Sequence, residues 1–114
     1  MTYAALAIDT GSFNQTLLDC VEDAVRSILG EEVLESLLIR LRTHDGLARN
    51  EIPGRLDVFF PALERAFGET SGKSVGRFII KVLYVRLGLK FDDRSKNVLL
   101  DYVEDARREL GVEN

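Results

Sequence analysis

Apolar residues recur three and four positions apart along most of the chain, a spacing typical of an amphipathic α-helix. The helical stretches are joined by short polar connections, and helices joined in this way pack as bundles. We therefore expect an all-α, single-domain bundle of four long helices plus one or two short helices, spanning residues 1–114. The stretches with the helical spacing are 17–29, 33–41, 61–67, 75–87 and 98–110.

The segment 75–87 is the most apolar part of the chain and is predicted to be the central, most buried helix. Its valines and isoleucines would also suit a strand. The length of the segment favours a helix, as do Lys73, Arg77 and Lys81, which lie four positions apart.

Residues 46–60 form the irregular part of the pattern. Pro53 and Gly54 make a turn dipeptide. Pro61 is tolerated only near the start of a helix, and it is expected to push Phe60 away from helical angles. A short helix is therefore predicted to begin close to Pro61.

The N-terminal and C-terminal segments of the chain have different predicted structures. Residues 1–11 are expected to be a flexible N-terminus, with Ser12 or Asn14 capping the first helix. A C-terminal helix is predicted within 92–114, packed on the bundle, because the acidic pair at 92–93 suits a helix N-terminus.

The stretch GETSGKS, at 68–74, resembles the second half of a phosphate-binding P-loop, G-x-x-x-x-G-K-[ST]. Only three residues separate Gly68 from Gly72, whereas the motif requires four. A helical pattern also stands where the motif requires a strand. We therefore expect no nucleotide hydrolysis here. Instead, Gly68 is predicted to end one helix, and Ser71 or Ser74 to cap the next.

The chain offers few residues for chemistry. Cys20 is the single cysteine and His44 the single histidine, so we expect neither a disulfide nor a His/Cys metal centre. Cys20 is interpreted as a buried, unreactive thiol, since its acidic segment offers no positive charge to activate it. His44 stands beside Asp45, a pairing that can orient a general base, but a surface turn is the better interpretation. We expect no enzyme activity and no cofactor, and cysteine usage indicates a cytoplasmic protein.

Charge is unevenly distributed along the chain. Residues 1–35 carry a net charge of −6, residues 36–91 of +5 and residues 92–114 of −3. The basic middle has two interpretations, either charges on solvated faces of a bundle or a surface for an anionic partner. The candidate anion or partner surface consists of Lys73, Arg77, Lys81, Arg40 and Arg42.

Three stretches together resemble a known family: DCVEDAVRSILGEEV (19–33), EIPGRLDVFFPALERAFG (51–68) and FIIKVLYVRLGLKF (78–91). The pattern is similar to the nitrososphaera output domain, a short all-helical archaeal module that occurs alone or at the end of signalling proteins. The resemblance covers residues 17–91 and rests mainly on core and turn positions. It implies an archaeal output or interaction domain with no catalytic residues to transfer. The polar residues before the central helix and the acidic C-terminal helix depart from it.

Three kinds of function remain. The first is a non-catalytic interaction module, such as a signalling output or adaptor domain, that binds another protein or a second copy of itself. For self-association, Tyr84 and Val85 are expected to remain for a partner helix. The second is a regulator that binds nucleic acid through the basic middle segment, with affinity that falls steeply with salt. The third is a sensor with a small ligand between helices. No membrane span is expected, since no run of about 18 apolar residues occurs.

Overall fold

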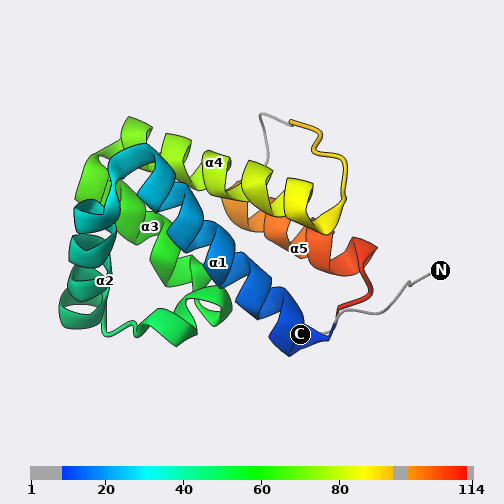
Figure 1. Ribbon diagram of the computed structural model, residues 1–114, viewed down its shortest axis with the longest axis horizontal. Coiled ribbons are helices and arrows are strands. Elements are labelled where there is room, and N and C mark those ends of the chain that lie inside the picture. Colours follow the sequence, from blue (N-terminus) through cyan, green and yellow to red (C-terminus); the bar gives the residue numbers. More distant parts are fainter. Residues whose placement is uncertain (1–8, 94–97, 113–114) are drawn as a thin grey trace.

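The helical spacing of the sequence becomes an all-helical fold in a computed structural model, which describes residues 9–93 and 98–112. Within this part of the chain there are five α-helices, one 3-10 helix and no strand (Figure 1). The predicted all-α class is therefore confirmed for the described residues. The elements are α1 (Thr10–Leu29), α2 (Glu31–Asp45), η1 (Arg49–Gly54), α3 (Leu56–Phe67), α4 (Glu69–Leu87) and α5 (Leu99–Glu109).

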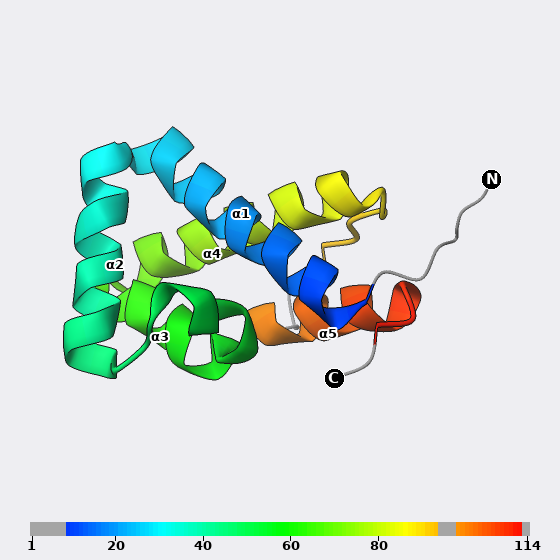
Figure 2. The same ribbon diagram turned by 60° about the horizontal axis from the view of Figure 1, so that its bottom comes forward.

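The helix α4 lies at the centre of the packing, as its apolar sequence predicts. It packs against α1, α3 and α5. Figures 1 and 2 show α2 standing across one end of the molecule, while α5 lies toward the other end. One hydrophobic cluster runs through all the elements, and fully burying one such side chain contributes about 2 kcal/mol. Its largest fully buried members include Phe13, Leu17, Phe59, Leu63, Ile79, Ile80 and Leu83.

The first helix begins earlier than the sequence predicts. Asp9 is its N-cap, and its Oδ1 accepts a hydrogen bond of 2.7 Å from the backbone N–H of Ser12. The prediction that Ser12 or Asn14 caps this helix is therefore wrong. Residues 1–8 of the predicted flexible N-terminus lie outside the described residues, whereas Gly11 already belongs to α1.

The helix α3 also begins earlier than predicted, and it contains Pro61 instead of starting there. Phe60 is helical, which corrects the expected effect of the following proline. Proline in a helix removes one backbone hydrogen bond. The helix nevertheless starts at Leu56 because its first two turns bury Leu56, Phe59 and Phe60 in the core.

The stretch GETSGKS is a helix–helix corner. Gly68 both ends α3 and precedes α4, with φ of 92°, a backbone conformation that only glycine adopts easily. The helix α4 then starts at Glu69, so Ser71 and Ser74 lie inside it and neither caps it. The corner brings α4 directly against α3 at Gly72, where an added Cβ would lie 2.5 Å from the Cα of Glu64.

The C-terminal helix is shorter than predicted. It begins at Leu99 with Val98 as its N-cap, and the acidic pair at 92–93 lies outside any helix. Val98 is the first apolar residue of the stretch 98–110 with helical spacing, but its side chain is 63% exposed and does not belong to the buried stripe. The stripe consists of Tyr102, Val103 and Ala106.

Candidate binding groove

The three predicted cations of α4 form one row along the helix, as their spacing predicts, but two of them are paired. The Nζ of Lys73 lies 3.0 Å from a carboxylate oxygen of Glu69. A guanidinium nitrogen of Arg77 lies 2.5 Å from Asp93. The Nζ of Lys81 lies 5.8 Å from the centre of the Phe91 ring. Each cation of the row therefore already has a partner on the protein itself.

The other two predicted site residues, Arg40 and Arg42, lie on α2. Arg40 lines a hollow of about 380 Å³ between α2 and the end of α3, together with Phe67. Lys73 and Arg77 line a different hollow. The five predicted cations are therefore divided between two places on the molecule.

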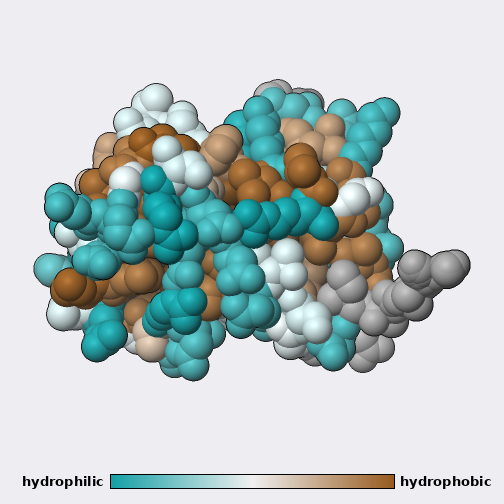
Figure 3. All heavy atoms as spheres, viewed as in Figure 1, coloured by the Kyte–Doolittle hydropathy of each residue, from teal (hydrophilic) through white to brown (hydrophobic). Residues whose placement is uncertain are grey.

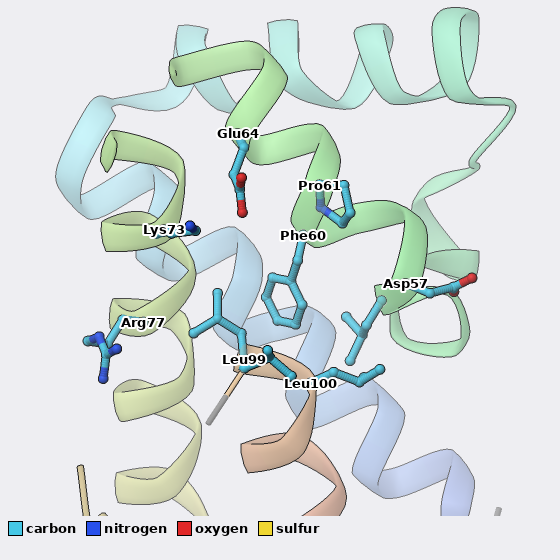
Figure 4. Close-up of a pocket in the computed structure, with 10 residues that line it drawn as sticks. Asp57, Phe60, Pro61, Glu64, Lys73, Arg77, Leu99 and Leu100 are labelled. Atoms are coloured by element: carbon cyan, nitrogen blue, oxygen red, sulfur yellow. The ribbon is translucent and has the colours of Figure 1, made fainter. Parts of the chain in front are cut away.

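The hollow beside Lys73 and Arg77 has a volume of about 470 Å³ and lies where α3, α4 and the start of α5 meet (Figure 4). Its floor is apolar. In Figure 4 the Phe60 ring extends from α3 toward Leu99 and Leu100 of α5. Glu64 of α3 and Lys73 of α4 lie at the same end of the hollow, and Asp57 lies near the other end of its α3 wall. The hollow thus combines an apolar floor with charged walls.

A second hollow continues the first along α5. It has a volume of about 450 Å³ and shares Leu56, Asp57 and Leu100 with the first. It also includes Val103 and ends beside Arg107. We call the two together the α3–α5 groove. The groove is bordered by α5 and its N-cap, from Val98 to Arg107. Because a helix rises 1.5 Å per residue, the length of the groove is about 14 Å.

Arg107, at this end of the groove, contacts two residues of α1. Its guanidinium carbon lies 4.5 Å from the centre of the Phe13 ring, and its Nη2 donates a hydrogen bond of 3.1 Å to the Oδ1 of Asn14. Partial burial lowers the pKa of Arg107 below its usual value. Among the described residues it forms no ion pair, so this desolvated cation has no carboxylate within 4 Å there.

Three carboxylates line the groove, those of Asp57, Glu64 and Glu104, and the first two differ in their partners. Asp57 accepts two hydrogen bonds of 3.1 Å from Arg55, and this guanidinium lowers the pKa of Asp57. Glu64 makes no ion pair within the described part of the chain. Its charge nevertheless contributes to the raised pKa of Lys73, after the larger effect of Glu69. Glu64 therefore sets a negative charge on the α3 wall, facing the cations of α4.

The start of α5 is anchored in a notch on α4. A Cβ added at Gly76 would lie 2.4 Å from the Cδ1 of Leu99. The side chain of Leu99 therefore occupies the space that a side chain at position 76 would fill. Val98, one residue earlier, projects at the mouth of the groove. Its aliphatic side chain makes no capping hydrogen bond, although Ser, Thr, Asp or Asn is preferred at this position.

A further apolar face lies on the outer side of α4. Val85 is 78% exposed and Phe78 38% exposed, and the two are seven positions apart. Figure 3 shows hydrophobic surface in the upper part of the view, where α4 runs in Figure 1, interrupted by hydrophilic side chains. Tyr84, expected to remain for a partner helix, is buried, and its hydroxyl donates to the carbonyl of Tyr102 at 2.7 Å. That expectation is therefore wrong for Tyr84.

His44 and Asp45, the pair considered for catalysis, do not line the α3–α5 groove. His44 is an exposed residue of α2, and its Nδ1 lies 3.3 Å from the Oγ1 of Thr43. The adjacent Asp45 pairs with Arg65 at 2.5 Å. The predicted surface position of His44 is therefore confirmed, although the residue lies in α2 and not in a turn, and Asp45 forms an ion pair between α2 and α3.

Cys20 is fully buried, as predicted. Burial raises the pKa of its thiol from about 9 to about 11, although Arg86 of α4 opposes the shift. The sequence gives no sign of this nearby cation, which is 66 positions away in the chain. Since the ordinary thiol ionises first, the unfolded state gains charge between pH 9 and 11 and stability falls there.

We expect Cys20 to react with iodoacetamide at pH 8 about 100-fold more slowly in the native protein than in denaturant, because two pKa units reduce the thiolate fraction about 100-fold. The measurement is the alkylation rate followed by mass spectrometry. The same reagent on the denatured chain is the control, and equal rates would contradict the burial of this thiol.

Two further findings concern the described residues alone. Among residues 9–93 and 98–112, no three His, Cys, Asp or Glu side chains form a group that could hold a metal ion. No helix in the same ranges is long and apolar enough to cross a membrane.

The chain matches no protein-family model, no curated protein and no solved structure. The resemblance to the nitrososphaera output domain therefore stays a prediction.

The sequence indicates only part of this groove. Lys73 and Arg77 were predicted as surface cations, whereas Glu64, Val98 and Arg107 were not connected with a site. The sequence around Arg107 does not indicate that this residue belongs to a site, because the residues that surround it come from α1. The sequence at Val98 does indicate something unusual, since a valine stands where a helix start favours a capping side chain.

Proposed function

We propose that this protein is a non-catalytic helical interaction module that binds another protein through the α3–α5 groove. The observation that carries the proposal is an apolar furrow about 14 Å long, bordered by charged side chains and with an exposed valine at its mouth. Exposed apolar surface rimmed by polar groups is typical of protein interaction sites. The role of a signalling output or adaptor domain, an archaeal origin and a cytoplasmic location belong to this proposal, and the resemblance described above supports them.

Val98 supports a binding role because it departs from the local rule for helix starts. A serine there would accept a hydrogen bond from the first turn of α5 and stabilise the helix. Departures from local preference concentrate at functional sites, where stability is exchanged for function. An exposed apolar N-cap beside an apolar groove fits this pattern.

Nucleic-acid binding is the alternative, and the distribution of the predicted cations argues against it. Lys73, Arg77 and Lys81 lie on α4, whereas Arg40 and Arg42 lie on α2. Lys73 and Arg77 line a different hollow from Arg40, so the five do not form one basic surface. The outer face of α4 is a third candidate, for self-association. A symmetric pairing of α4 with its copy would bring Lys81 near its own counterpart, which is electrostatically unfavourable.

We expect Val98→Ser to stabilise the protein by about 1 kcal/mol and at the same time to reduce capture of partner proteins. The stability is measured by urea denaturation. Capture is measured with tagged full-length protein and lysate of the source organism, with and without nuclease. Val85→Ser is the matched control, because it makes the same change at an exposed valine outside the groove, which is 78% exposed against 63% for Val98.

Three outcomes would contradict the proposal. If nuclease abolishes all capture, nucleic-acid binding becomes the better assignment. If nothing is captured in either arm, an adaptor function is wrong. If Val85→Ser reduces capture and Val98→Ser does not, the binding surface is the outer face of α4.

A further inference from the structure

We infer that the occupant of the α3–α5 groove is an amphipathic helix of the partner protein, with carboxylates on the side that faces Lys73 and Arg77. This inference rests on the proposed function and adds the chemistry of the partner. Its basis is the shape of the groove, the apolar residues of its floor and the arrangement of charge along its walls.

The shape of the groove suits a helix. The two hollows are open to the surface and adjoin at Leu56 and Leu100, so they form a furrow and not an enclosed cavity. A small ligand is usually buried over most of its surface, which an open furrow does not provide. A furrow of about 14 Å matches between two and three helical turns, the extent of contact made by amphipathic helices that bind in grooves.

The floor of the groove supplies a row of apolar contacts for such a helix. Phe60 and Leu99 lie at the α4 end, Leu100 in the middle, and Val103 toward Arg107. Apolar anchors at positions i, i+3 or i+4, and i+7 of a bound helix would cover this line. Aromatic and aliphatic anchors in such depressions carry most of the binding energy in helix complexes.

The charges along the groove define the orientation of the partner. The acids that pair with Lys73 and Arg77 have side chains that are 75% and 56% exposed. Exposed pairs of this kind contribute little to stability, so an incoming carboxylate can replace them at little cost. Glu64 lies on the opposite wall and would repel a carboxylate there. The acidic side of the partner must therefore face α4.

Arg107 provides a second cation at the far end. It is partly desolvated and contacts the amide oxygen of Asn14 and the ring of Phe13, and the carboxylate of Glu104 also lines this end of the groove. A charged hydrogen bond is stronger where water is partly excluded. A carboxylate near the other end of the partner helix would therefore gain more from Arg107 than from a fully exposed arginine.

The test uses two labelled helical peptides of about 15 residues, a length that sustains a helix. Both carry leucines along one face on an alanine background. One has glutamates beside both ends of the leucine ridge, and the other has lysines at the same positions. Fluorescence polarisation with the full chain measures both affinities. We expect the glutamate peptide to bind about tenfold more tightly, as one charged hydrogen bond would give.

Reversing the charges of Lys73 and Arg77 tests whether these two cations cause the preference for the glutamate peptide. In the double variant Lys73→Glu/Arg77→Glu, the preference is expected to reverse in favour of the lysine peptide. Arg40→Glu/Arg42→Glu is the matched control, because it makes the same change of charge on α2, and it should keep the preference for glutamate. If the reversed variant does not give a native circular dichroism spectrum, Lys73→Gln/Arg77→Gln should abolish the preference.

Equal binding of the two peptides, or the same change of preference in the α2 control, would overturn the inference. Lysate capture that survives nuclease and depends on Val98 would then still support the proposed function. Absence of such capture would instead contradict the proposed function itself. Dimerisation of the chain without peptide binding would identify a second copy as the occupant.

Discussion

Gly72→Ala is expected to destabilise the protein by about 2 kcal/mol, although alanine is the better helix former. A Cβ at this position would lie 2.5 Å from the Cα of Glu64 and 2.7 Å from its backbone nitrogen. Backbone atoms cannot rotate away as a side chain can, so α3 and α4 would have to separate. The gain in helix propensity of about 1 kcal/mol offsets only part of an overpacking cost of about 3 kcal/mol.

Urea denaturation followed by circular dichroism measures this loss, and Gly76→Ala is its control. The two glycines are four positions apart on α4 and offer the same chemical change. At Gly76 the nearest atom is the terminal Cδ1 of Leu99, which can move, so we expect a change of less than about 1 kcal/mol. Equal losses in both variants would show that the close contact of α3 and α4 is not what makes Gly72 necessary.

Phe13→Ala is expected to have the largest effect, a loss of about 4 kcal/mol. The ring of Phe13 is fully buried in the core cluster, so its removal leaves a cavity as well as lost apolar contacts. The same ring lies 4.5 Å from the guanidinium of Arg107, an interaction worth about 1 kcal/mol. The variant should therefore also loosen α5 from α1.

Two measurements separate these effects. Urea denaturation gives the total loss, and amide hydrogen exchange reports the opening of α5. A double-mutant cycle of Phe13→Leu with Arg107→Gln isolates the coupling between the two residues, since leucine keeps much of the buried volume. Native exchange rates in α5 of the Phe13→Ala variant would contradict the role of Phe13 in holding this helix.

The positions of the helices could be predicted because apolar spacing is a local property. The buried stripe of α1 and that of α2 up to Leu41 follow from it directly. The predicted starts of helices are wrong where tertiary packing overrides local preference. Proline inside α3 is tolerated because the residues before it bury aromatic rings. Similarly, α4 starts at Glu69 because Gly72 allows close packing on α3, not because a serine caps it.

The groove could be predicted only in part, because its walls come from three helices distant in sequence. The row of Lys73 and Arg77 follows from helical periodicity alone. Glu64, opposite Lys73, depends on the packing of α3 on α4. The half-buried state of Arg107 depends on Phe13, which lies 94 positions earlier. No local pattern contains such a contact.

The single-residue corner at Gly68 has a consequence for the order of folding. It joins α3 to α4 with no loop between them, and the two helices pack closely at Gly72. Contacts between neighbouring segments of a chain lose the least entropy when they form. This helical hairpin is therefore the part of the chain that can assemble at the smallest entropic cost. We expect it to act as the nucleus on which α1, and then α5, is added.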